Sequence, residues 1–139
     1  MKNRLLSYAI WLIIFSALCL ILLSVFWLVY PYKTVEVNDF KTTKIEYNAG
    51  EIVTYTFIYS KYTNESAMVY RQLINSVTYQ LDFTNNNFPM TENQAGSNTV
   101  KLPLEMEPDT YVLRLVSTIK VNPLRNITKE FTSKPFIIK

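Results

Sequence analysis

Residues 5–30 read LLSYAIWLIIFSALCLILLSVFWLVY, and this stretch decides the organisation of the chain because its 26 residues carry no charge. About 20 apolar residues suffice to cross the hydrocarbon core of a bilayer as a helix. Trp11 lies near one end, and Trp27 and Tyr30 lie at the other, where aromatic rings favour the level of the lipid headgroups. Pro31 then ends the helix, because proline lacks a backbone N–H. The stretch predicts one transmembrane helix with Trp11, Trp27 and Tyr30 as its membrane anchors.

The charges beside this stretch predict its orientation. Lys2 and Arg4 precede it, and no acidic residue occurs before it. Because positive charge is retained on the cytoplasmic side, we expect residues 1–4 to be cytoplasmic. The remainder of the chain is then expected outside the cytoplasmic (inner) membrane, in the periplasm or the extracellular space. A cleaved signal peptide has an apolar run of only about 7–15 residues followed by a small-x-small site. The present run is longer and lacks that site, so we expect an uncleaved signal anchor, with cleavage as the alternative.

Composition excludes several classes of function for the part of the chain beyond this stretch. Of the 14 Lys and Arg residues, 12 lie beyond residue 30 and nearly balance all 11 Asp and Glu residues. No basic surface for nucleic acid is therefore expected. The chain has no histidine and two glycines, and its single cysteine, Cys19, lies within the apolar stretch. Since the usual general base, thiolate nucleophile, zinc ligands and phosphate loop are missing, we expect no enzyme, cofactor or metal.

Apolar and polar residues alternate from residue 34 onward, which is typical of strands with one buried face. The clearest runs are 53–60 and 111–122, and turn residues separate them. The expected strands lie at 34–39, 43–48, 52–60, 67–74, 76–83, 98–104, 111–122 and 127–138. Pro135 is expected to divide the last strand, and 84–98 is expected to be a long loop. So many short strands predict an antiparallel sandwich over 34–139, joined to the helix by a linker at 31–33.

Two motifs resemble immunoglobulin-like domains. AGEIVTYTFIY, residues 49–59, is similar to the second strand of bacterial members of that family. PDTYVL, residues 108–113, resembles the proline turn and tyrosine that begin the sixth strand of immunoglobulin-like and fibronectin type III-like domains. The resemblance implies an all-β immunoglobulin-like sandwich with structural roles for Gly50 and Pro108. It also implies that Tyr111 donates a hydrogen bond to upstream backbone as a tyrosine corner. The cysteine–tryptophan–cysteine core of antibody domains is absent.

A second resemblance is to uncharacterised small proteins of tailed phages, which carry an N-terminal anchor before an immunoglobulin-like domain. The similar pieces include YKTVEVN at 32–38, YSKYT at 59–63 and VNPLR at 121–125. This similarity implies a phage or bacterial origin and brings no activity with it.

Four residues are candidates for contacts with a partner: Tyr62, Tyr70, Arg71 and Arg125. Exposed tyrosines supply rigid contact area. The two arginines lie beside turns or strand ends, where they could meet a partner's acidic group. An internal salt bridge or a solvated side chain is the preferred interpretation for both, with Asp82 or Glu130 as internal partners of Arg125. Three nearby acids, Glu105, Glu107 and Asp109, could bind Ca²⁺, although solvated turn acids are the preferred interpretation.

These features together predict a membrane-tethered, non-enzymatic interaction module that holds a β-sandwich just outside the membrane. Its expected partners are the lipid bilayer and a protein in or near the membrane, because the linker at 31–33 gives little reach. If the chain is phage-encoded, such a module would act on the host envelope. The alternative is a structural subunit that oligomerises through its helix and sheet edges.

Overall fold

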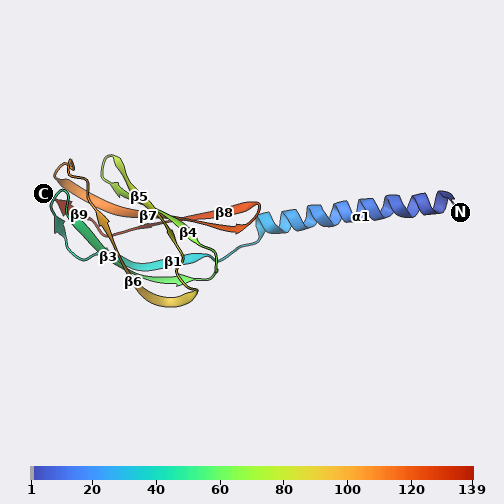
Figure 1. Cartoon of the computed structure of the whole chain (residues 1–139), viewed down its shortest axis with the longest axis horizontal. Helices are drawn as coiled ribbons and strands as arrows, with labels where there is room; N and C mark the ends of the chain where they lie inside the picture. The colour runs from blue at the N-terminus through green and yellow to red at the C-terminus, as the bar shows by residue number, and fades with distance from the viewer. Residues whose placement is uncertain (1) are drawn as a thin grey trace. The chain divides into compact units, whose positions relative to one another are not determined.

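The computed structural model describes residues 2–139, which divide into two compact units. The helix unit contains the chain up to Tyr32 together with the turn Asn122–Arg125. The β unit contains Lys33–Val121 and Asn126–Lys139. Figure 1 shows the helix in blue and the strands in colours from cyan to red. The helix unit ends within the expected linker at residues 31–33, and it also includes the turn Asn122–Arg125, which the sequence placed in the sandwich.

Helix α1 (Lys2–Val29) accounts for the apolar N-terminal stretch. Its segment Leu6–Val29 is long and apolar enough to cross a membrane, and a signal sequence near an N-terminus has the same properties. The backbone N–H of Tyr30 still donates to the carbonyl of Phe26 at 2.9 Å. Pro31 ends the hydrogen-bonding pattern as predicted, since it has no N–H to donate.

The β unit contains two sheets that do not close into a barrel. The smaller sheet has the strand order β1-β3-β6, and both pairings are antiparallel. The larger sheet has the order β2-β9-β7-β4-β5, with β8 paired to β7. In it, β4 runs antiparallel to β5 and β7, whereas β2 and β9 are parallel. The strand bounds are β1 (Val35–Thr42), β2 (Glu46–Tyr47), β3 (Ile52–Lys61), β4 (Ala67–Ile74), β5 (Thr78–Asn86), β6 (Thr91–Lys101), β7 (Asp109–Asn122), β8 (Arg125–Thr132) and β9 (Phe136–Ile138).

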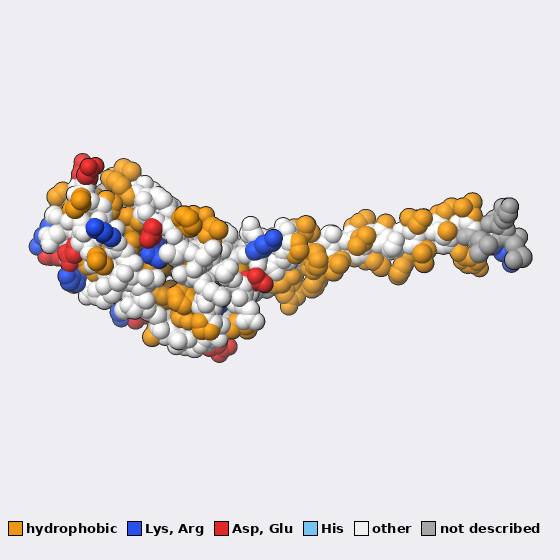
Figure 2. Space-filling view, viewed as in Figure 1, with side chains coloured by type: hydrophobic (Ala, Val, Ile, Leu, Met, Phe, Trp, Pro, Cys, Tyr) orange, Lys and Arg blue, Asp and Glu red, His pale blue; other side chains and the backbone are white. Residues whose placement is uncertain are grey.

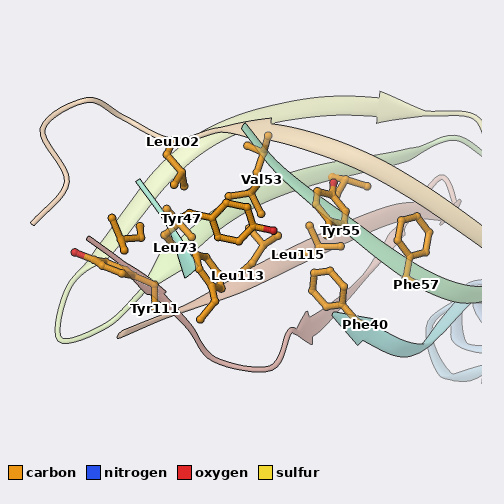
Figure 3. Packing of buried hydrophobic residues seen from close by; sticks show 14 of the residues in the cluster. Phe40, Tyr47, Val53, Tyr55, Phe57, Leu73, Leu102, Tyr111, Leu113 and Leu115 are labelled. Carbon is orange, nitrogen blue, oxygen red and sulfur yellow. The ribbon is translucent and has the colours of Figure 1, made fainter. Parts of the chain in front are cut away.

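The hydrophobic core lies between the inner faces of the two sheets. In β3, β4 and β7, buried residues alternate with partly exposed ones, as the period of two predicts. Figure 3 shows side chains from both sheets pointing toward one another, with Phe40 near Tyr55. These two rings pack edge to face with centroids 5.6 Å apart. Leu73, Leu113 and Tyr111 are fully buried. Each large apolar side chain buried in this way contributes about 1.5–3 kcal/mol to folding.

The predicted loop at 84–98 is largely wrong, because this region is mostly strand. Strand β5 continues to Asn86 and β6 already begins at Thr91. The sequence of β6, TENQAGSNTVK, is polar because it forms an exposed edge of the smaller sheet. Its main-chain hydrogen bonds to β3 make it a strand without help from an apolar pattern. The predicted division at Pro135 is confirmed, since β8 ends at Thr132 and β9 begins at Phe136.

Two turns of the β unit have the geometry that their sequences predict. Gly50 has φ +78°, and a Cβ there would lie 2.4 Å from Cδ2 of Leu104, so only glycine fits without strain. The hydroxyl of Tyr111 donates to the carbonyl of Glu107 at 3.0 Å. This is the predicted bond to upstream backbone, across the turn that contains Pro108.

Candidate interaction surfaces

The membrane anchors predicted from the sequence lie on an exposed helix surface. Trp11 is 67% exposed and Tyr30 is 45% exposed, whereas Trp27 is half-buried. The ring of Tyr30 packs between Phe26, at 5.0 Å, and Tyr32, at 4.8 Å. Figure 2 shows hydrophobic side chains along the length of this helix. The aromatic cluster therefore gathers at one end of the apolar segment, where a membrane interface would place it.

Arg125 lies against the C-terminal end of α1 rather than on a free surface. Its Nη1 donates to the carbonyl oxygens of Leu28 and Tyr30, both at 2.8 Å. The side-chain amide of Asn122 donates to the carbonyl of Trp27, also at 2.8 Å. The bonds to Trp27 and Leu28 satisfy carbonyls that a helix end leaves without partners, and the cation complements the negative end of the helix dipole.

The alternative partners expected for Arg125 are engaged elsewhere. Asp82 pairs with Arg71 at 3.1 Å, and Glu130 pairs with Arg114 at 3.2 Å. The expected salt bridge of Arg125 is therefore wrong. Sequence reasoning missed its role because the helix end and the turn are more than 90 residues apart along the chain.

Tyr70 belongs to an exposed apolar patch on the outer face of β4 and β5. Its ring lies 6.0 Å from that of Phe83, the residue opposite it in the β4–β5 ladder. Its hydroxyl donates to the sulfur of Met68 at 2.8 Å. Phe83 is 65% exposed and Met68 is 38% exposed. We call Met68, Tyr70 and Phe83 the β4–β5 patch.

Arg71, beside Tyr70, is buried and points to the opposite face of β4. Only 4% of the residue is exposed, and it pairs with Asp82, which is the internal salt bridge expected for it rather than a contact with a partner. Nη1 donates to Asp82 and to the main-chain carbonyl of Thr99 in β6, at 3.1 and 3.0 Å. Nη2 donates to the hydroxyl of Thr84 at 3.0 Å. Arg71 thus links the two sheets, and its Nε is buried without a hydrogen-bond partner among the described residues.

Tyr62 is half-buried and committed to contacts within the β unit. Its hydroxyl donates to the carboxylate of Glu36 at 3.1 Å. The ammonium group of Lys33 lies 5.2 Å from the centre of its ring, within the range of a cation–π interaction. Tyr62 therefore ties the start of the β unit to the end of β3, which makes it a weaker candidate for partner binding than Tyr70.

A cavity of about 50 Å³ remains between the sheets, lined by apolar residues that include Val37, Tyr59 and Phe131. Lys61 also lines it and is 3% exposed. Its ammonium group donates to the carbonyl of Phe88 at 2.7 Å, and burial lowers its pKa. One water needs roughly 10–15 Å³, so the cavity holds only a few atoms. It is a packing gap around a buried cation rather than a pocket of the size that holds a substrate.

The acidic residues do not assemble into a metal centre in the described part of the chain. No group of three or more His, Cys, Asp or Glu residues there lies close enough together to hold an ion. Glu105, Glu107 and Asp109 are all exposed, and Asp109 accepts a hydrogen bond from the side chain of Asn75 at 3.0 Å. Their geometry is that of solvated acids beside a turn.

Comparisons with known proteins identify distant likenesses in fold. No protein-family model matches the sequence, and no curated protein matches it. Among solved structures, Spo0M, a sporulation control protein from Bacillus subtilis, superposes with a TM-score of 0.53 at 13% sequence identity. The match covers 78% of this chain and 50% of Spo0M, so the chain spans half the length of that protein.

A second solved structure is the alkylpurine DNA glycosylase AlkC from Pseudomonas fluorescens bound to DNA. It matches with a TM-score of 0.47 at 12% identity, over 78% of this chain and 31% of AlkC. At such identities, the comparison with Spo0M concerns the fold alone.

Proposed function

We propose that this chain is a membrane-tethered, non-enzymatic interaction module. Helix α1 crosses the cytoplasmic membrane with its N-terminus inside. The β unit, an immunoglobulin-like sandwich, is held outside and presents the β4–β5 patch to a protein at the membrane surface.

The length and flanks of α1 support the tether. The segment Leu6–Val29 is long enough to span a bilayer, and the aromatic cluster around Tyr30 suits its outer interface. Lys2 and Arg4 precede the segment without an acid, which favours a cytoplasmic N-terminus.

Strand order and the corner at Tyr111 support the immunoglobulin-like interpretation. One sheet pairs β3 with β1 and β6, and the other places β7 between β4 and β8. The hydroxyl bond of Tyr111 to Glu107 lies at the start of β7, as the tyrosine corner does at the start of the sixth strand of such domains.

The exposure of the β4–β5 patch is the observation that carries the proposal. Aromatic residues and methionine are enriched at the centres of protein interfaces, where charged residues are depleted. Phe83 is 65% exposed on the outer face of the larger sheet, where it lies opposite Tyr70. A bound partner would bury these side chains, and removal of apolar surface from water favours association.

Site-specific photocrosslinking tests this assignment. A photoreactive phenylalanine analogue replaces Phe83 in the full-length chain, expressed in membranes of its native host cell. A matched chain carries the analogue at Ser97, an exposed residue of β6 in the other sheet. The proposal predicts a crosslink to one membrane-associated protein from position 83 and none to that protein from position 97.

Two other results would contradict the proposal. Equal crosslinking of the same protein from both positions would remove the role of the patch. Crosslinks from position 83 only to a second copy of this chain would instead support a self-assembling structural subunit.

A further inference from the structure

The turn between β7 and β8 reaches the same level as the C-terminal end of α1. Asn122 and Arg125 donate to the carbonyls of Trp27, Leu28 and Tyr30 at 2.8 Å. Hydrogen bonds of that length hold the turn directly beside the helix end. In a bilayer, the turn would therefore lie at the same depth as the helix end. If α1 spans a membrane, the turn is therefore at the level of the aromatic anchors.

The chemistry of the turn suits a lipid interface. Leu124 is 54% exposed, and Pro123 beside it is also exposed. Both hydrogen bonds of Arg125 leave from Nη1, and its Nη2 and Nε make none to another described residue. Those N–H groups remain able to bind a phosphate, for which the planar guanidinium is well suited.

We propose that the turn Asn122–Arg125 is a second membrane contact, which rests on the proposed tether. Leu124 enters the boundary between headgroups and acyl chains, as apolar residues of interfacial segments do. Arg125 caps the helix through Nη1 and faces a phospholipid phosphate with its remaining donors. The lipid class that it favours is anionic, since such lipids attract basic residues at the membrane surface.

The need of backbone carbonyls for hydrogen-bond partners also supports the membrane contact of the turn. Carbonyl groups at membrane depth need hydrogen-bond partners, because water is scarce there. The turn supplies hydrogen-bond donors to three carbonyls at the helix end. These carbonyls therefore do not need water as a hydrogen-bond partner. The turn and the helix end can therefore share the headgroup layer.

Depth-dependent fluorescence quenching tests the contact in the full-length chain. In a Cys19→Ser background, single cysteines at Leu12, Leu124 and Ser97 carry the environment-sensitive dye NBD. The chains are reconstituted in vesicles of phosphatidylcholine and phosphatidylglycerol at about 7:3, with or without doxyl-labelled lipid. We expect strong quenching at position 12, clear quenching and a blue-shifted emission at position 124, and neither at position 97.

The pattern of quenching separates the inference from the tether. Quenching at position 12 with a water-like signal at position 124 would overturn the membrane contact and leave the tether intact. A water-like signal at position 12 would overturn both.

The role of Arg125 has its own readout, because capping a helix does not depend on the charge of the lipid. Arg125→Gln in the position-124 chain is compared with Arg114→Gln, whose side chain bonds Gln72 and Glu130 within the β unit. In the parent chain, we expect about twofold stronger quenching in vesicles with phosphatidylglycerol than in phosphatidylcholine alone. Arg125→Gln should abolish this difference and Arg114→Gln should retain it. A difference that survives Arg125→Gln would overturn the assignment of Arg125 to lipid phosphate.

Discussion

The outer faces of the two sheets differ in the side chains that they expose to solvent. The smaller sheet presents Thr56, Ile58 and Ser97 around a shallow hollow of about 410 Å³. Gly96 lies in that hollow, and a Cβ there would lie 2.7 Å from the ring of Phe57 behind it. The larger sheet instead exposes the aromatic and sulfur-containing side chains of the β4–β5 patch. One outer face is ordinary solvated sheet, and the other resembles the centre of an interface.

The contrast extends to the two faces of β4. Tyr70 faces outward with Phe83, whereas its neighbour Arg71 faces inward and is 4% exposed. Arg71 makes its hydrogen bonds within the fold, whereas Tyr70 and Phe83 pack against each other on the outer face. Substitutions on the inner face should therefore change stability, while those in the patch should change binding and leave stability nearly unaltered.

The largest effect on stability is expected for Arg71→Ala. The change removes bonds to Asp82, Thr84 and the carbonyl of Thr99, and leaves that carbonyl unpaired between the sheets. Loss of one partner in such a buried network costs roughly 2–4 kcal/mol. Urea unfolding of the full chain in detergent micelles measures it. Arg71→Met keeps most of the side-chain volume, so it should lower the unfolding free energy by less. Equal stability of Arg71→Ala and the parent would contradict the difference proposed between the two faces of β4.

Tyr55 makes stability depend on pH in the alkaline range. Burial raises the pKa of this phenol to about 12 from its ordinary value of 10.0. Because the folded state favours the neutral form, the stabilisation is complete below pH 10 and is lost as the pH rises from 10 to 12. The loss is roughly 2–3 kcal/mol. Across this range, the unfolding free energy of the parent should fall relative to that of Tyr55→Phe, and parallel curves would contradict the prediction.

Gly50→Ala tests backbone strain far from the patch. The residue has φ +78°, and its new Cβ would approach the side chain of Leu104. We expect a loss of about 1–2 kcal/mol in unfolding free energy, because alanine must either adopt this conformation or distort the turn. Gly96→Ala gives a matched measurement at a glycine without a positive φ, where the new Cβ would instead meet the buried ring of Phe57.

Tyr111→Phe removes one hydroxyl and keeps the packed ring. The bond to the carbonyl of Glu107 at 3.0 Å is lost, and the neighbouring turn loses one constraint. We expect unfolding free energy to fall by about 1 kcal/mol, the usual net contribution of such a bond. A change within experimental error would show that the corner contributes nothing to this domain.

Phe83→Ser should have the smallest effect on stability, below about 0.5 kcal/mol, because the side chain is 65% exposed. It should nevertheless reduce crosslinking of the partner strongly. Thermal unfolding of the purified chain measures the change in stability. A loss above 2 kcal/mol would mean that Phe83 serves the fold, and the contrast between the two outer faces would then carry no functional meaning.

Sequence patterns predicted those parts of the fold that depend on local periodicity and turn chemistry. The uninterrupted apolar run predicted α1, and the alternation at 111–122 predicted β7. Only the end of β6 was predicted, within the expected strand at 98–104. The part from Thr91 to Ser97 was missed because its side chains are polar and its pairing with β3 is made by the backbone. The strand propensities of individual residues do not indicate which neighbouring strand will pair with them.

The candidate surfaces were predicted less well, because they depend on tertiary placement. Tyr70 was singled out, but its neighbours Phe83 and Met68 were not, since they come together only through the β4–β5 register. Arg71 and Arg125 have the same side chain but different environments in the fold. One lies between the sheets and the other caps a helix, and only the long-range fold distinguishes them.

Crosslinked affinity purification with matched outer-face variants tests whether the β4–β5 patch binds a membrane-associated protein. The full-length chain carries a C-terminal tag and is recovered from crosslinked membranes of its native host cell. Phe83→Ser alters the patch, and Ile58→Ser makes a similar change on the outer face of the smaller sheet. The account predicts one specific membrane-associated protein with the parent and with Ile58→Ser, and its loss with Phe83→Ser. Undiminished recovery with Phe83→Ser would contradict it.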